Sequence, residues 1–143
     1  MNWEEAHSVI ERLNKESYCG YSDWRLPTDK ELESLVDRSQ HNPALPQDHP
    51  FINIKSDWYW SSATFAYDTD YAWVVYLRSG RVSYSHKLYN YHVWPVRAYI
   101  NYKPNEIALR KGRFWDLEDE TVIDRITALM WTRDANMQEE PRK

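Results

Sequence analysis

The sequence predicts an α+β fold in which two helices pack on twisted antiparallel sheets. Three observations lead to this prediction. Apolar residues recur at helical spacing in the N-terminal third, short runs rich in aromatic and β-branched residues follow from residue 58 onward, and turn residues separate those runs. At 143 residues the chain has the size of one domain, so we expect one compact core.

Two helices are predicted before residue 37. The first begins after Asn2, a capping residue with Glu5 three positions later. The second begins after Thr28, which forms a capping box with Glu31, and Pro27 fixes its start. Helical spacing then predicts which side chains face the core: Ala6, Val9, Ile10 and Leu13 in the first helix, and Leu32, Leu35 and Val36 in the second.

Strands are predicted after a proline-rich loop at Gln40–Pro50. Gly80 marks a hairpin turn between the second and the third strand, and both faces of the second strand are apolar, which is typical of a central position. Pro95 lacks an amide hydrogen, so it places the last strand at a sheet edge or at a bulge. The four predicted strands are Trp58–Ser62, Tyr71–Leu77, Arg81–Lys87 and His92–Ile100.

The C-terminal segment Arg113–Asn136 is predicted to be a hairpin of two short apolar strands around an acidic turn. It would lead naturally into the first helix if the two chain ends were joined. We expect the hairpin around Thr121–Ile123 to pair with His92–Ile100, either within the chain or across a homodimer formed by hairpin exchange. The predicted divisions are a main body at 1–100, a connector at 101–112, the completing hairpin at 113–136 and a charged tail at 137–143.

Composition argues against several classes of function. The net charge of −4 gives no general attraction to nucleic acid. No apolar run is long enough for membrane insertion, and no signal peptide is recognisable. Cys19 is the only cysteine, which excludes an intrachain disulfide and a cysteine-rich zinc site. A reducing compartment fits a lone cysteine best, although a trimmed exported protein would look the same, so the compartment stays open.

Catalysis finds little support in the sequence. The five histidines show no metal-ligand spacing, and neither a glycine-rich phosphate loop nor a Gly-x-Ser-x-Gly elbow is present. Cys19 stands beside Gly20 in a predicted turn, where an inert thiol is the favoured interpretation. We therefore expect no enzymatic activity and no cofactor.

The middle third of the chain contains the candidate ligand-binding surface. Residues 51–100 carry three acidic and five basic side chains, a net charge of +2, and they contain 14 of the 22 aromatic residues. Rings, hydroxyls and cations together can stack on a sugar or a base or anchor a protein partner; the alternative is that the tyrosines only cover the sheet. The candidates are Tyr67, Asp70, Tyr71, Arg78, Arg81, Tyr84, His86, Tyr89 and Tyr91.

Several blocks of the sequence resemble the Lcl C-terminal domain family. The Asp-Trp-Arg-Leu-Pro-Thr and Tyr-Trp-Ser-Ser runs are specific, and Arg113–Asn136 resembles the opening hairpin that normally precedes the Trp-x-x-Ala helix of that family. The resemblance implies a C-type-lectin-like fold in a circularly permuted or out-of-phase tandem arrangement. The resembling blocks are Trp3–Ala6, Gly20–Thr28, Trp58–Ser62, Ala72–Val74 and Val96–Arg97.

The resemblance also implies adhesion to glycans, and the basic middle third would accommodate sulfated ones. On this interpretation the chain is a non-enzymatic ligand-binding or adhesion module. The alternative is a protein-interaction or assembly module, phage-encoded or of a variable ligand-binding type. The residues given a structural role are Trp3, Trp24, Arg25, Pro27, Thr28, Trp58, Trp60, Trp73, Arg97 and Trp131.

The sequence departs from this family at two places. Ile10 and Pro95 stand where many members have a disulfide between the first helix and the last strand. The turn of the opening hairpin, which in many members looks suited to calcium, here reads Asp-Leu-Glu-Asp-Glu without a glycine. Asp116 and Asp119 are therefore weak calcium candidates, and an ordinary solvated acidic turn is the favoured interpretation.

Overall fold

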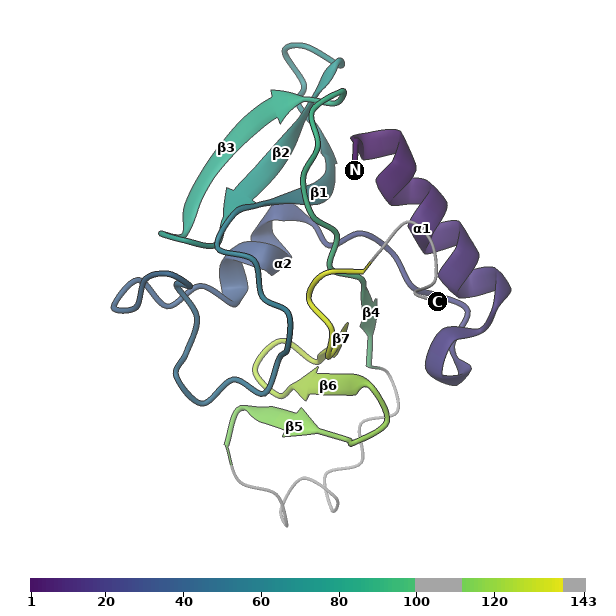
Figure 1. The fold of residues 1–143 in the computed structure, drawn as a ribbon, viewed down its shortest axis with the longest axis vertical. Coiled ribbons are helices and arrows are strands. Elements are labelled where there is room, and N and C mark those ends of the chain that lie inside the picture. Colours follow the sequence, from purple (N-terminus) through teal and green to yellow (C-terminus); the bar gives the residue numbers. More distant parts are fainter. Residues whose placement is uncertain (100–111, 138–143) are drawn as a thin grey trace.

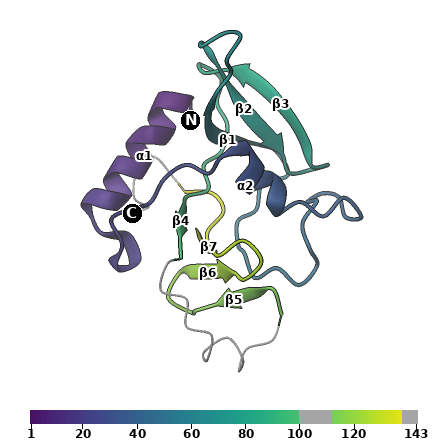
Figure 2. The ribbon, with the colours of Figure 1, turned by 180° about the vertical axis from the view of Figure 1, so that it is seen from behind.

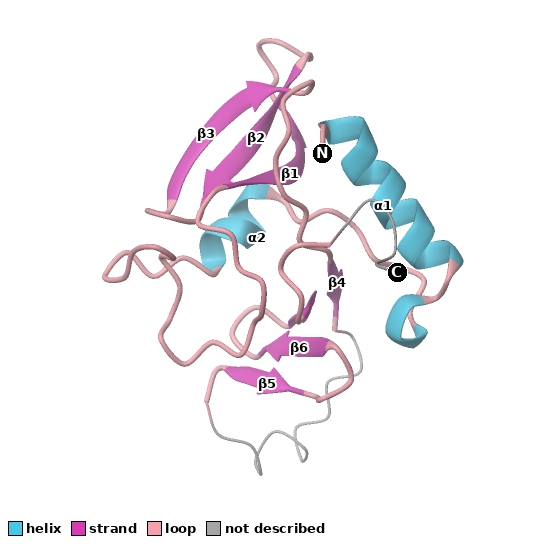
Figure 3. Ribbon diagram, in the orientation of Figure 1, coloured by secondary structure: helices cyan, strands magenta, loops and turns pink. Residues whose placement is uncertain are grey.

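Two antiparallel sheets and two α-helices form the described part of the chain (Figures 1 and 3). The computed structural model describes residues 1–99 and 112–137. One sheet has the strand order β1-β2-β3 and the other the order β4-β7-β6-β5, which confirms the predicted α+β class. In chain order the elements are α1 (Trp3–Lys15), the 3₁₀ helix η1 (Tyr18–Gly20), α2 (Asp29–Ser34), β1 (Trp58–Thr64), β2 (Tyr71–Tyr76), β3 (Arg81–His86), β4 (Val96–Ala98), β5 (Phe114–Asp116), β6 (Thr121–Asp124) and β7 (Leu129–Thr132).

Both α-helices begin where their capping residues predict. The Asn2 side chain accepts the Glu5 amide at 2.9 Å, and the Glu5 carboxylate accepts the Asn2 amide at 2.8 Å. Thr28 and Glu31 form the same reciprocal pair at 3.1 and 2.9 Å. The predicted core residues of both helices are buried, except for Val36, which is half-buried after the end of α2.

The three-stranded sheet packs against a different helix on each face. Trp60 lies opposite Val74, and both belong to one core cluster with the buried residues of α1. The neighbouring pair, Tyr59 and Val75, belongs to a second cluster with the buried leucines of α2. Figure 2, seen from behind, brings α2 to the front of this sheet. β2 is the central strand, as predicted from its two apolar faces.

The turn between β2 and β3 contains Gly80, as predicted. Its φ is +85°, in the region that favours glycine, and a Cβ at this position would clash with Cγ1 of Val36. The Gly80 amide donates to the Tyr76 carbonyl at 2.7 Å. The turn is therefore fixed against the residue that follows α2.

The last predicted strand, His92–Ile100, is wrong in its extent. Within the described residues only Val96–Ala98 is a strand, and His92 forms an isolated parallel bridge with Tyr59 of β1. The chain passes here from one sheet to the other, and Pro95, which has no amide hydrogen, lies at the crossing. β4 is the terminal strand of its sheet, which confirms the predicted edge position, while Ile100 lies outside the described residues.

The C-terminal segment contains three strands, so the predicted two-strand hairpin is wrong. β5 and β6 enclose the acidic turn, and β6 and β7 form a second hairpin. The second turn, at residues 125–128, has no glycine, proline or asparagine. It is closed by the Asp124 carboxylate, which accepts the Ile126 amide at 3.0 Å, and Ala128 adopts a φ of +56°. An alanine in the left-handed region is uncommon, so the sequence carries no signal for this turn.

The pairing with β4 is within the chain, as one of the two expected arrangements requires, but β7 makes it, whereas Thr121–Ile123 lies in β6 and pairs with β5 and β7. The register places Trp131 opposite Val96, and the fully buried Trp131 ring lies 5.0 Å from that of Trp94. Met137, assigned from the sequence to the tail, is 8% exposed and belongs to the core. Exchange of these strands between two copies stays a prediction, and residues 101–111 of the predicted connector lie outside the described residues.

A buried ion pair joins the C-terminal strands to α2. Asp124 is fully buried and accepts two hydrogen bonds from Arg113, at 2.9 and 2.8 Å. Arg113 also donates to the Ser34 carbonyl at the end of α2, at 2.7 Å. A buried carboxylate is tolerated only when it is paired and hydrogen-bonded, so this contact fixes how the strands dock.

Removal of residues 113–143 is expected to abolish cooperative folding. The truncated chain would lose β5, β6 and β7 and would expose Trp94 and Val96, both fully buried in the full chain. Thermal unfolding followed by near-ultraviolet circular dichroism measures the effect. A soluble fragment 1–112 with a sharp unfolding transition would contradict the expectation.

A control within the same segment is Ile126→Ala. Ile126 is 74% exposed, so its truncation should change the unfolding free energy by no more than about 0.5 kcal/mol.

Candidate functional site

The residues given a structural role in the sequence analysis are called the signature residues. Two of them, Arg25 and Arg97, form ion pairs that join separate segments of the scaffold. The Arg25 guanidinium donates to both oxygens of Glu31, at 2.6 and 2.8 Å. Arg97 donates to both oxygens of Asp23, at 2.6 and 3.1 Å, and lies 3.8 Å from the ring centre of Tyr21. The closest partner of Arg25 is therefore a carboxylate on the N-terminal turn of α2.

Most other signature residues fill the core. Trp24, Trp60 and Trp131 are at most 2% exposed, while Trp58 and Trp73 are half-buried against the three-stranded sheet. Pro27 and Thr28 lead into α2. These positions are explained by packing and capping, with Trp3 as the exception, since it lines a cleft.

Five candidate ligand-binding residues form a connected group of rings at one end of the three-stranded sheet. Phe65, which the sequence reasoning missed, links them: its ring stacks on Tyr84 at 4.1 Å and lies 5.6 Å from Tyr67. Tyr71 contacts both Tyr84 and His86, at 6.0 and 5.1 Å. We call this group the tyrosine patch; it consists of Phe65, Tyr67, Tyr71, Tyr84, His86 and Tyr89.

The remaining candidates lie elsewhere. In the β2–β3 register Tyr71 is opposite His86, whereas Arg81 is opposite Tyr76, so Arg81 and the nearby Arg78 lie about 17 Å away at the other end of the hairpin. Tyr91 borders the patch, with its ring 6.4 Å from that of Tyr89, but its hydroxyl hydrogen-bonds with the buried Ser85 at 2.8 Å and its ring contacts Trp60 of the core at 5.0 Å. The expected single face with tyrosines and arginines together is therefore divided.

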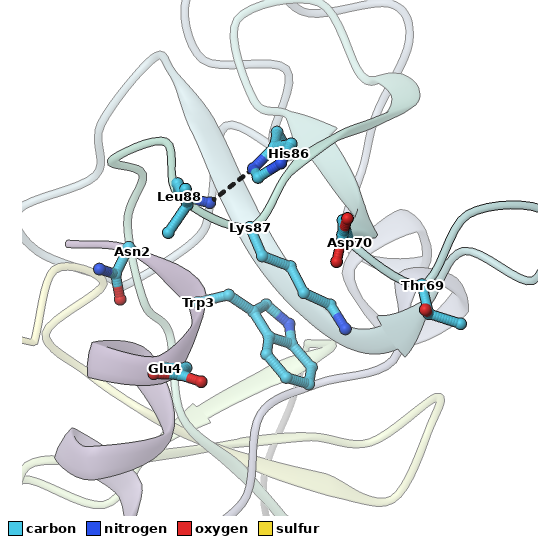
Figure 4. A pocket seen from close by; sticks show the side chains of 8 residues that line it. All are labelled: Asn2, Trp3, Glu4, Thr69, Asp70, His86, Lys87 and Leu88. Atoms are coloured by element: carbon cyan, nitrogen blue, oxygen red, sulfur yellow. Dashed lines mark hydrogen bonds between the residues drawn. The ribbon is translucent and has the colours of Figure 1, made fainter.

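A cleft of about 500 Å³ adjoins the tyrosine patch (Figure 4). Three segments line it: the first turn of α1 with the residue before it, residues 69–70 before β2, and residues 86–88 at the end of β3. Asp70 is the one further candidate that lines it, and His86 belongs to both the patch and the cleft. The volume falls within the range of small-ligand sites.

Trp3 and Lys87 form the floor of the cleft. The Lys87 ammonium lies 4.0 Å from the centre of the Trp3 ring and donates to the Thr64 hydroxyl at 3.0 Å. The Trp3 indole donates to the Ser61 carbonyl at 3.0 Å, and its amide donates to the Lys87 carbonyl at 3.0 Å. α1 is thereby attached to the end of β3, and the two elements share a wall of the cleft.

Sequence reasoning missed six of the eight cleft residues as ligand candidates. Asn2 and Trp3 were given structural roles only, and Glu4, Thr69, Lys87 and Leu88 were not singled out. Trp3 and Lys87 are far apart in the sequence, so no local pattern connects them. The folded chain brings them together, and the Trp3 amide donates to the Lys87 carbonyl.

The described residues hold no group of three or more His, Cys, Asp or Glu side chains arranged for a metal ion. Asp116 accepts the Glu118 amide at 2.9 Å, and Asp119 accepts the Thr121 amide at 3.1 Å, so both weak calcium candidates close their own turn. Burial, with Asp119 and Glu120 nearby, raises the pKa of the Cys19 thiol, which disfavours the reactive thiolate. Within the described ranges no helix is long and apolar enough to span a membrane.

The residues that build this scaffold lie in a part of the chain that matches a known protein family. The family model described as the Lcl C-terminal domain matches residues 1–97. The chain belongs to the Lcl C-terminal domain family. The match ends within β4, so β5, β6 and β7 of this Lcl C-terminal domain lie outside it. No curated protein and no solved structure matches the chain, and the C-type-lectin-like topology stays a prediction.

The Arg25–Glu31 pair predicts an acid-sensitive contribution to stability. Burial alone would raise the pKa of the Glu31 carboxyl, but hydrogen bonds from Arg25 and from the Thr28 amide outweigh it and hold that pKa below its ordinary value. A carboxyl whose pKa is lowered by folding stabilises the protein above its unfolded pKa of about 4.3, and this stability is lost as the pH falls through the folded pKa.

Glu31→Gln is expected to lower the unfolding free energy by about 1–2 kcal/mol at neutral pH and to flatten its decline in acid. Urea unfolding at a series of pH values measures both effects. Glu33→Gln is the matched control, because Glu33 pairs only at 3.7 and 3.6 Å with the exposed Lys30 and Arg38. Equal pH dependence in the two variants would contradict the assignment.

Proposed function

We propose that this Lcl C-terminal domain is a non-enzymatic ligand-binding or adhesion module that recognises a glycan through the tyrosine patch and the adjoining cleft. The observation that carries the proposal is the exposure of large rings that are held in place by other rings. Tyr67 is 92% exposed, Tyr89 60% and Tyr84 50%. Large aromatic side chains normally bury most of their surface, so such a group indicates a contact surface.

The geometry of the patch favours stacking on a flat ligand. Tyr84 is held by Phe65 beneath it and by Trp73 at its edge, with ring centres 4.1 and 5.9 Å away. A ring fixed in this way loses little conformational entropy on binding, and each tyrosine adds a hydroxyl that can hydrogen-bond with sugar hydroxyls. The adjoining cleft supplies depth, which a flat patch of rings lacks.

A protein-interaction module is the second candidate, and one observation favours it. β3 is the terminal strand of its sheet and carries Tyr84. An edge strand can pair with an extended segment of another chain, while the tyrosines would hold its side chains. A glycan array with no signal at low ionic strength would favour this second candidate over the first.

The double variant Tyr67→Ala/Tyr84→Ala is expected to weaken binding to the glycans found on such an array at least about tenfold, because it removes two stacking rings. Isothermal titration calorimetry measures the affinity, and the melting temperature reports whether the fold survives. Ile126→Ala removes another exposed apolar side chain, in the turn between β6 and β7, and should leave the affinity unchanged. Unchanged binding by the double variant would contradict the role of the patch.

A further inference from the structure

We infer that the cleft takes an uncharged pyranose residue rather than a sulfated one, an inference that rests on the proposed glycan-binding function. The charges that line the cleft decide between these two classes of ligand. Two carboxylates and one ammonium group line it, those of Glu4, Asp70 and Lys87. They belong to three different segments, which meet only in the folded chain (Figure 4).

The two carboxylates are available to a ligand. Glu4 and Asp70 are both exposed, and neither takes part in an ion pair within the described part of the chain. Two hydrogen bonds fix the backbone of Asp70. Its amide donates to the Asp68 carboxylate at 3.1 Å, and its carbonyl accepts the Lys87 amide at 2.8 Å. A sulfate or a sugar carboxylate entering the cleft would therefore meet two like charges.

The ammonium of Lys87 is already engaged. It donates to Thr64 and lies over the Trp3 ring, as described above. One of its three N–H groups is used by Thr64 and its charge also interacts with the Trp3 ring, so Lys87 offsets only part of the repulsion between the two carboxylates and an anionic ligand. The exposed arginines of the middle third offer no help here, because Arg81 lies opposite Tyr76, at the far end of the hairpin from His86. The middle third of the sequence carries a net charge of +2, but the charged groups that line the cleft are two carboxylates and one ammonium.

The polar groups of the cleft match adjacent hydroxyls. An ionised carboxylate accepts hydrogen bonds on both oxygens, so it can hold two neighbouring hydroxyl groups of one sugar ring. His86 Nδ1 accepts the Leu88 amide at 3.1 Å, so a neutral His86 ring carries its proton on Nε2 and can donate to a ring or hydroxyl oxygen. Leu88, 72% exposed, offers an apolar surface for the C–H face of the sugar.

The test compares matched ligands on the intact chain by isothermal titration calorimetry. The probes are dextran and dextran sulfate oligosaccharides, and neutral agarose and sulfated carrageenan oligosaccharides. In a pair that binds, the uncharged member is expected to bind at least about tenfold more tightly than its sulfated counterpart at low ionic strength. Tighter binding of the sulfated member would overturn the inference.

A variant pair locates the effect in the cleft. Glu4→Gln/Asp70→Asn is expected to weaken the uncharged ligand about tenfold and to reduce the discrimination against its sulfated counterpart. Glu11→Gln, also exposed and two turns further along α1, is the control and should change neither. If the double variant behaves like this control, the cleft is not the site.

The outcomes separate this inference from the proposed function. If no oligosaccharide binds in calorimetry or on the array, the proposed function fails and the inference fails with it. If a glycan binds and depends on Tyr67 and Tyr84 but prefers sulfate or ignores Asp70, the proposed function stands and only the inference falls.

Discussion

The backbone of residues 91–97 is the constraint on which the rest of the structure depends. On one side His92 exchanges hydrogen bonds with β1, donating to the Trp58 carbonyl and accepting the Trp60 amide at 3.1 and 3.0 Å. Further along, Val96 exchanges hydrogen bonds with Arg25 at 3.0 and 2.9 Å and lies opposite Trp131 in β7. One extended stretch therefore joins both sheets and the signature block. Because its polar groups are satisfied from several directions, it can be buried without an energetic penalty.

The same stretch determines where the cleft forms. The Tyr91 amide donates to the Met1 carbonyl at 2.8 Å, and the Met1 ammonium donates to the Tyr91 carbonyl at 3.0 Å. This reciprocal pair fixes the residues before α1 beside the end of β3, so Trp3 meets Lys87. Met137 donates to the Val93 carbonyl at 3.2 Å, two residues further along. Both described ends of the chain thus pack on one segment, which explains how a C-terminal group of strands can complete a sheet beside the N-terminal helix.

Sequence reasoning was reliable where a local pattern decides the structure. Capping boxes fixed both helix starts, and apolar spacing identified the buried side chains, because these signals lie within a few residues of one another. It failed at the turn before β7, where Ala128 adopts a left-handed conformation that only the surrounding pairing supports. It did not show that residues 91–93 turn toward α1, because the bridge between His92 and Tyr59 leaves no local signal in the sequence. For the site, it found the tyrosines but not the cleft beside them.

Most of the residues that resemble the family build the scaffold, whereas the tyrosine patch is built from other residues. The signature residues Trp24, Arg25, Trp60 and Arg97 are buried or ion-paired, so they specify the scaffold shared by the family. The tyrosine patch consists of residues outside the resembling blocks, and it can vary without disturbing the core. Trp3 alone has both roles, since its indole anchors α1 to β1 while its ring supports the cleft. Family membership therefore accounts for the scaffold, and the proposed ligand recognition depends on the patch and the cleft of this chain.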